Sequence, residues 1–307
     1  MELKRNVVVY DAPSNLGLRP PEDGVVPGCY KSPWALRDKN LLSLISADDG
    51  GSLVPPQYSS QWKPGDGDRN AEAIASYSVD LANRLNAAID SQRQVLVLGG
   101  DCSILIGNML GLKRRGRYGL VFFDAHSDFR HLENSPHIHA AAGEDLAIVT
   151  GRGDKRLIQL EKLGPYVLDE DVHIVGIRQN DVCLDELKTT EIQVTTSQQM
   201  KNLNCARLVT EILNTVTQHT AGFWIHLDLD VIDASEMPAV DSPEIDGPTF
   251  KTISELLSEL LCSNYCLGLE VTIYDPDLDP KGVYADRIVE CLSEAFIRTK
   301  KKNTILD

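Results

Sequence analysis

The sequence lacks long hydrophobic runs and an excess of positive charge. No uninterrupted apolar run approaches the roughly 18 residues of a membrane span, and the N-terminal MELKRNVVVY passes from charged residues straight into an apolar run, unlike a secretory signal. Lysine and arginine number 30 against 45 aspartate and glutamate, a formal net charge of −15. We therefore expect neither nucleic acid nor a membrane as a partner, because both need a basic surface. The charge permits a small cationic substrate.

The sequence also lacks a disulfide framework. Seven cysteines are spread over 307 residues, and an odd count leaves at least one of them without a disulfide partner. Cys262 and Cys266, in CSNYC, have the wrong spacing for the redox C-x-x-C motif. We expect reduced thiols in a cytoplasmic protein.

Short apolar runs recur along the chain, and most are too continuously apolar to form strands with one exposed face. Such runs are typical of a parallel sheet covered on both faces. The expected strands lie at residues 6–10, 94–100, 119–124, 172–177, 222–228 and 266–272.

Helical patterns alternate with these strands. The expected helices cover residues 71–89, 104–115, 205–218, 252–262 and 285–300. This alternation predicts right-handed βαβ units in a doubly wound α/β sheet, with residues 1–307 as a single domain. The segment 12–67, rich in Pro, Gly, Ser and Asp, is expected to be a long surface loop with a short helix around residues 33–45.

Several expected strands end in side chains that can hold a metal, and in an open parallel sheet ligands bind beyond these ends. FFDAHSD places Asp124, His126 and Asp128 at alternate positions, so an extended backbone would point all three the same way. HLDLDVID places Asp228 and Asp230 on one side in the same manner.

Two further strand ends add to this set. GGDCS carries Cys102 and GLEVT carries Glu270. Asp101 and Asp233, which stand in the same motifs, are equally typical of turns and helix N-caps.

Carboxylates placed directly after apolar strands would repel one another and lose hydration unless cations compensate them. A ligand set rich in carboxylates suggests a hard or borderline divalent ion, Mn²⁺ first. The donors are numerous enough for two ions. Two ions about 3.5–4 Å apart can lower the pKa of a shared water and deliver hydroxide to an electrophilic carbon.

The motifs DAHSD, DLDVID and GLEVT resemble three signatures of the arginase/agmatinase superfamily, the ureohydrolases, and GGDCS resembles the remaining one, usually GGDHS. The resemblance extends over residues 95–272 in the family's order. It implies a three-layer α/β/α fold around a mainly parallel, eight-stranded sheet. It also implies a binuclear manganese centre, hydrolysis of a guanidino group to release urea or a related product, and homo-oligomers, commonly trimers or hexamers.

The resemblance further implies a role for each motif residue. Glu270 would accept hydrogen bonds from the substrate guanidinium, and Asp128 would hold the proton of the attacking hydroxide and pass it on. One ion would be held by Cys102, Asp124, Asp128 and Asp228, and the other by Asp124, His126, Asp228 and Asp230.

Cys102 stands where the family usually has histidine. We expect it to open a helix beside a cation, where both lower the pKa of a thiol, and to bind as a thiolate that shifts preference from Mn²⁺ toward Zn²⁺, Fe²⁺ or Co²⁺. In the alternative, Cys102 is a small apolar filler and this metal position is weak. Some superfamily members with this cysteine act on N-hydroxyarginine, and MPAVDSPEIDGPTF (237–250) resembles that subgroup.

The loop after DAHSD is expected to bind the far end of the substrate. His131, His137 and His139 compete for the role of proton relay, and His139 matches best by its spacing to DLAIVTG. Arg130 stands where it could pair with a substrate carboxylate or point at solvent, and the resemblance places Asp181 where it can contact an α-amino group.

Other classes of protein remain to be weighed. A catalytically impaired relative kept for binding or regulation would share these motifs. A deacetylase-like hydrolase with one zinc needs fewer carboxylates, and a nucleotide-binding protein needs the G-x-G-x-x-G that is missing after the first strand. Arginine, N-hydroxyarginine, agmatine and guanidinobutyrate all remain candidate substrates.

Overall fold

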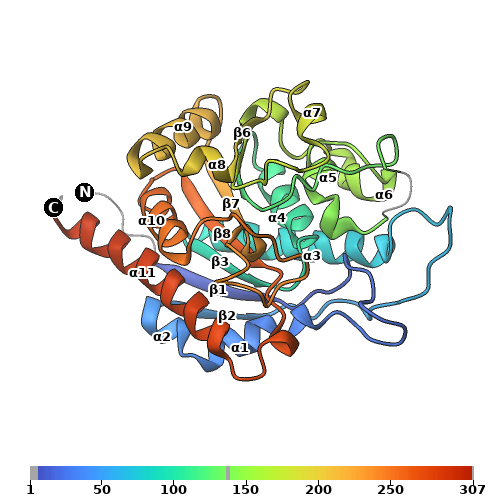
Figure 1. Ribbon diagram of the computed structural model, residues 1–307, viewed down its shortest axis with the longest axis horizontal. Helices are drawn as coiled ribbons and strands as arrows, with labels where there is room; N and C mark the ends of the chain where they lie inside the picture. Colours follow the sequence, from blue (N-terminus) through green and yellow to red (C-terminus); the bar gives the residue numbers. More distant parts are fainter. Residues whose placement is uncertain (1–5, 136–138, 306–307) are drawn as a thin grey trace.

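The computed structural model describes residues 6–135 and 139–305, whose strands form one sheet (Figure 1). The order across the sheet is β2-β1-β3-β8-β7-β4-β5-β6, and every neighbouring pair is parallel. The strands are β1 (Val7–Ala12), β2 (Asp48–Ser52), β3 (Gln94–Gly99), β4 (Gly119–Phe123), β5 (Val172–Val175), β6 (Gln193–Thr195), β7 (Phe223–Asp228) and β8 (Cys266–Thr272). The expected parallel α/β sheet is confirmed.

The two strands that the sequence did not predict are the two edge strands. β2 has the sequence DDGGS and β6 has only three residues, QVT. An edge strand has one neighbour and an exposed side, so it needs no apolar run. The expectation of a long surface loop over 12–67 is therefore wrong at β2, whereas α1 (Ser32–Asp38) and α2 (Leu41–Ile45) confirm the short helix expected within it.

Helices cover both faces of the sheet and give the expected three layers (Figure 1). One face packs against α1, α2, α9 (Cys205–Thr217), α10 (Phe250–Leu261) and α11 (Val283–Ile305), with α8 (Ser197–Met200) at its margin. The other face packs against α3 (Ala71–Asp90), α4 (Ile104–Lys113), α5 (Asp145–Val149), α6 (Lys155–Ile158) and α7 (Leu184–Leu187).

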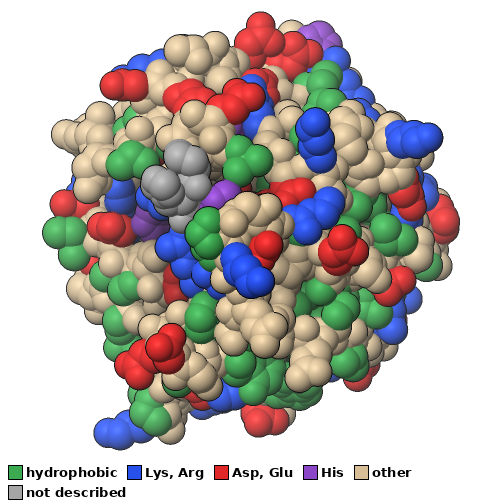
Figure 2. Space-filling model, turned by 90° about the vertical axis from the view of Figure 1, so that its right-hand side faces the viewer, with side chains coloured by type: hydrophobic (Ala, Val, Ile, Leu, Met, Phe, Trp, Pro, Cys, Tyr) green, Lys and Arg blue, Asp and Glu red, His purple; other side chains and the backbone are tan. Residues whose placement is uncertain are grey.

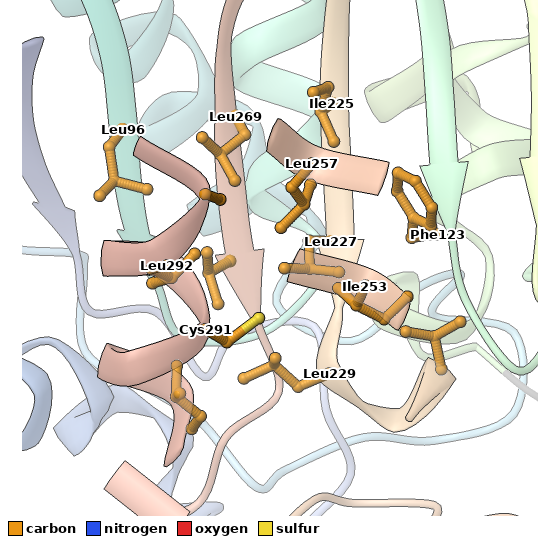
Figure 3. Close-up of a cluster of buried hydrophobic side chains, with 14 of the residues drawn as sticks. Leu96, Phe123, Ile225, Leu227, Leu229, Ile253, Leu257, Leu269, Cys291 and Leu292 are labelled. Atoms are coloured by element: carbon orange, nitrogen blue, oxygen red, sulfur yellow. The ribbon is translucent and has the colours of Figure 1, made fainter. Parts of the chain in front are cut away.

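Buried apolar side chains pack the central strands against α10 (Figure 3). Ile225 and Leu227 of β7 and Leu269 of β8 are buried against Ile253 and Leu257 of α10. Each such side chain contributes about 1.5–3 kcal/mol when fully buried. The strand ends are therefore held on a densely packed platform.

The order of the strands brings the chemistry-bearing motifs together. β3, β8, β7 and β4 are consecutive in the sheet, and all run in the same direction. Their carboxyl ends lie along one edge of the sheet, where ligands of parallel sheets bind. Cys102, Glu270, Asp228 and Asp124 come from these four strands or directly follow them.

Gly100 fixes the turn that carries Cys102. A β-carbon at this position would lie 1.7 Å from the carbonyl oxygen of Ser14, so only glycine allows the loop after β1 to pack here. The Gly100 carbonyl also accepts a hydrogen bond of 2.8 Å from the Ile273 amide just beyond β8. Three strand ends are thereby fastened to one another beside the thiol.

The excess acidic side chains do not gather in one patch on the face shown in Figure 2. Acidic and basic side chains alternate over the face shown in Figure 2. Within residues 6–135 and 139–305, no helix combines the length and the apolar composition that crossing a bilayer requires.

Asp279 ties the segment after β8 to the start of α11. Its carboxylate accepts hydrogen bonds from the Tyr274 hydroxyl (2.9 Å) and from the amides of Val283 (2.9 Å), Tyr284 (2.8 Å) and Ala285 (3.0 Å). We predict that Asp279→Ala lowers the free energy of unfolding by about 2 kcal/mol, since helix N-caps contribute about 0.5–2 kcal/mol and a buried hydroxyl also loses its acceptor.

Urea denaturation measures this loss. Asp185→Ala is the matched control, because the Asp185 side chain is 94% exposed and pairs only with Lys188 at the surface. We expect no measurable change in the control. Equal midpoints for the two variants would contradict the anchoring role.

Candidate metal centre and substrate pocket

Asp124, His126 and Asp230 converge beyond β4 and β7. One donor atom from each of the three lies within 4.8 Å of the other two. The Nδ1 atom of His126 is 2.9 Å from Oδ2 of Asp230 and 3.6 Å from Oδ1 of Asp124. The Ala125 amide donates to Oδ1 of Asp230 (3.1 Å) and so ties the two strand ends together.

A second group lies deeper, beyond β3 and β7. Donor atoms of Cys102, His226 and Asp228 also lie within 4.8 Å of one another. The Cys102 thiol donates to Oδ2 of Asp228 (2.8 Å), and its Sγ is 3.2 Å from Oγ1 of Thr272. All three members of this group are fully or almost fully buried.

The backbone after β4 differs from the expected extended geometry. β4 ends at Phe123, the chain bends at residues 125–126, and Asp128 adopts a left-handed conformation with φ of 42°. The expectation that an extended chain aligns these side chains is wrong, because Asp124 accepts a hydrogen bond of 2.6 Å from the His126 amide and closes a tight turn. The turn, and not a pleated strand, directs these side chains.

The buried carboxyls perturb one another strongly. Burial, together with the neighbouring carboxylates of Asp128 and Asp230, raises the pKa of Asp124 well above its usual range. Burial and the same kind of repulsion, from Asp230 and Asp124, raise the pKa of Asp228. Burial lowers the pKa of His126, but its hydrogen bonds with Asp124 and Asp230 outweigh this and raise it to about 12.

These groups fit divalent cations. Oδ2 of Asp124 is inaccessible to solvent and accepts no hydrogen bond from the described residues. A buried carboxylate oxygen without a donor is costly, and repulsion between clustered carboxylates adds to the cost. Cations bound between the carboxylates remove both penalties.

Without a bound cation, the Cys102 thiol does not have the lowered pKa that we expected from the sequence. It precedes Ser103, the N-cap of α4, but burial and the carboxylate of Asp228 raise the pKa of the thiol well above its usual value. The expectation that the helix start lowers this pKa is wrong, because desolvation and nearby negative charge outweigh the helix. A thiolate here therefore requires a cation.

A cavity of about 380 Å³ is lined by members of both groups of donors. Asp128 and Asp230, called its base here, line it together with Arg130 and Asp181, called its wall here. Asp181 is held in place by the amides of Ser127 (3.1 Å) and Cys183 (2.8 Å), which donate to its two carboxylate oxygens. Further lining side chains are Arg19, His126, Asp228, Asp241 and Ser242.

Glu270 does not line this cavity in the described part of the chain. Its side chain is fully buried, Oε1 lies 2.7 Å from Nδ1 of His226, and Oε2 accepts a hydrogen bond from the Asn108 amide. The expected contact of Glu270 with a substrate guanidinium is not met by this geometry, because both carboxylate oxygens already have buried partners, His226 and Asn108.

The three candidate relay histidines lie in different places. Nε2 of His131 is 3.0 Å from Glu186 and faces another cavity. His137 lies outside the described residues. His139 is buried against Trp62 with ring centroids 5.1 Å apart, and its Nδ1 atom is 3.8 Å from Oδ1 of Asp68.

Sequence reasoning missed His226 and Asp145. His226 interrupts the apolar run of β7 two positions before Asp228, and the strand period places both side chains on one face. That alternation could have revealed it. Asp145 begins α5 ahead of a buried apolar run, where an acidic residue is typical of a helix start, so no local signal distinguishes it.

The fold and the site together define a class of three-layer α/β/α proteins whose candidate metal ligands lie at the carboxyl edge of a parallel sheet. A family model described as Arginase family matches residues 22–297. Arginase from Bacillus caldovelox is 32% identical over 237 residues, covering 74% of this chain and 77% of that protein. Arginase from Bacillus subtilis is 29% identical over 281 residues, covering 86% and 92%.

The structural comparison agrees. The native structure of the Bacillus caldovelox arginase superposes with a TM-score of 0.85 at 26% identity, covering 95% of this chain and 98% of that one. The chain belongs to the arginase family, and it is a binuclear-metal amidinohydrolase of the ureohydrolase superfamily.

The position of His139 leads to a prediction. Because its ring packs on Trp62 and is not among the described residues that line the cavity, we expect His139→Asn to lower thermal stability and keep kcat within about threefold, whereas losing a general acid costs about 10²–10⁴-fold. The pH dependence of kcat and a melting curve measure the two effects. A hundredfold loss of kcat with an altered pH profile would restore His139 as the relay.

Proposed function

We propose that this protein hydrolyses the guanidino C–N bond of an α-amino acid, arginine or N-hydroxyarginine, and releases urea or hydroxyurea. One observation carries the proposal, namely that a single cavity combines a carboxylate-rich base with Arg130 and Asp181 on its wall. The base suits a guanidinium cation beside bound metal ions. The wall suits the opposite end of an amino acid.

The wall selects between the candidate substrates. The planar guanidinium of Arg130 can form two parallel hydrogen bonds with a substrate carboxylate. The carboxylate of Asp181 complements an α-ammonium group. Agmatine lacks the carboxylate and guanidinobutyrate lacks the amine, so each satisfies only one of the two residues.

We propose two divalent ions, with Mn²⁺ as the principal candidate, held by the ligand sets expected from the sequence. These are Cys102, Asp124, Asp128 and Asp228 for one ion, and Asp124, His126, Asp228 and Asp230 for the other. When bound, such ions supply a hydroxide nucleophile at neutral pH.

The side chains of the protein then do the positioning and the proton transfer. Arg130 and Asp181 hold the amino-acid end, which directs the guanidino carbon toward the base of the cavity. Asp128 lines that base and is placed to take the proton of the attacking water and pass it to the departing amine. Holding the substrate in a confined cavity also excludes competing water.

A release screen tests this function. Purified protein loaded with Mn²⁺, Zn²⁺ or Co²⁺ is incubated with arginine, N-hydroxyarginine, agmatine and guanidinobutyrate, and urea and hydroxyurea are measured. We expect turnover of an α-amino-acid substrate with at least one ion. Binding of ions and guanidino compounds without any turnover would support instead a binding or regulatory role.

Arg130 gives the sharper test of specificity. We predict that Arg130→Met raises KM for the amino-acid substrate about 10- to 100-fold, since a hydrogen bond to a charged group contributes about 1.5–3 kcal/mol, and leaves any slow agmatine turnover unchanged. Arg114→Met is the matched control, because Arg114 pairs with Glu161 at the surface. Equal effects on both substrates would contradict a carboxylate contact.

We propose further that the chain acts as one catalytic domain in a cytoplasmic homo-oligomer, a trimer or hexamer. The family resemblance supports assembly. Cys29, Cys102, Cys183 and Cys291 are free thiols, which suits a reducing compartment. Sedimentation equilibrium that returns a monomer at micromolar concentration would exclude the oligomer.

A further inference from the structure

The middle of the sheet contains a buried histidine. His226 lies on β7, is 0% exposed, and shares its strand face with Asp228. On the neighbouring strand, Glu270 pairs with His226 in the register and Thr272 pairs with Asp228. An imidazole and a carboxylate therefore stand side by side on two adjacent strands.

The contacts of His226 fix the orientation of its imidazole ring. Nδ1 lies 2.7 Å from Oε1 of Glu270, and Asn108 donates to the other oxygen of that carboxylate. Phe122 stacks on the ring with centroids 4.6 Å apart. A carboxylate that accepts from Nδ1–H leaves Nε2 with a lone pair, which is the arrangement found behind metal-binding histidines.

The Nε2 atom faces a second group without a partner. It forms no hydrogen bond with the described residues and lies 3.9 Å from Oδ2 of Asp145. Asp145 is 0% exposed, and neither of its carboxylate oxygens has a hydrogen-bond partner in the described chain. Leaving both buried groups without a partner is costly, because each has lost its hydration and the carboxylate also carries a charge.

The spacing suits a shared tetrahedral ion. Two N or O ligands at about 2.1 Å from one tetrahedral ion lie about 3.4 Å apart, so a shared ion would draw Nε2 of His226 and Oδ2 of Asp145 together from their 3.9 Å. The sulfur of Cys102 and the carboxylate of Asp228 lie within 4.8 Å of a nitrogen of His226 and of each other, and Asp145 approaches this set at Nε2 of His226. A donor set of sulfur, nitrogen and two carboxylates is typical of Zn²⁺ or Co²⁺, not of Mn²⁺.

We propose that one of the two ions is a zinc-type ion held by Cys102, His226 and Asp228, with Asp145 as its fourth ligand. This proposal rests on the proposed metal-dependent function, and it replaces Asp124 and Asp128 as ligands of that ion. Asp124 remains with His126 and Asp230 around the second ion. Glu270 becomes the positioning residue that orients His226.

Metal competition tests the ligand set. Protein freed of metal is dialysed against equal concentrations of Zn²⁺ and Mn²⁺, and bound metal per chain is measured by mass spectrometry. We expect one Zn²⁺ and a second ion in the unaltered protein. His226→Gln should lose zinc affinity at least about 10-fold and keep the second ion, and Asp145→Asn should weaken zinc in the same direction.

His173→Gln is the matched control. His173 is also a buried strand histidine, on β5, but its Nε2 and Nδ1 atoms contact the Thr195 and Thr215 hydroxyls at 2.9 and 3.3 Å. We expect this variant to retain both ions. Zinc bound by His226→Gln with the affinity of the control would overturn the proposal.

Spectroscopy of the unaltered protein gives an answer that does not depend on a folded variant. X-ray absorption at the zinc edge should show one sulfur and one imidazole around the ion, and either sulfur without imidazole or only oxygen donors would overturn the ligand set. The Co²⁺-loaded protein should show a sulfur-to-cobalt charge-transfer band that Cys102→Ser removes.

The same measurements distinguish a wrong ligand set from a wrong proposed function. Two bound ions, neither of which has both sulfur and imidazole as ligands, would refute this ligand set and leave the proposed hydrolase intact. Failure of the unaltered protein to bind any divalent ion would refute the proposed function as well.

Discussion

Repulsion among buried carboxylates is the constraint on which the active end of this molecule depends. The carboxyl ends of three adjacent parallel strands bring Asp124, Asp228, Asp230 and Glu270 together in a region with little access to water. The packed strands cannot move these groups apart without giving up core contacts. Positive charge is therefore needed to compensate these carboxylates. Divalent cations and a cationic substrate can both supply it.

Sequence reasoning succeeded where one physical signal dominates. The six central strands are continuous apolar runs because both faces are covered, and the long helices have a clear amphipathic period. The edge strands β2 and β6 have no such signal, since one neighbour and a solvent-exposed side allow polar residues such as Asp48 and Gln193. At the site, Asp124 and Asp228 were identifiable because a carboxylate at the end of a buried strand loses hydration and needs a compensating partner.

The remaining site residues depend on contacts between distant parts of the chain. Asp145 is 21 positions beyond Asp124 and resembles any acidic residue at a helix start, and only the fold brings it to His226. The tight turn that orients Asp128 and the packing of His139 on Trp62 are equally tertiary features. The metal site and the substrate wall thus differ in origin, since strand ends build the first and loops such as those carrying Arg130 and Asp181 build the second.

The most direct measurement is anomalous diffraction from crystals of the protein equilibrated with Mn²⁺ and Zn²⁺, recorded at the absorption edge of each metal. The account predicts two peaks about 3.5–4 Å apart at the carboxyl edge of the central strands, in contact with Asp228 and Asp230. Fully occupied crystals with neither peak, or with metal bound only elsewhere on the surface, would contradict it.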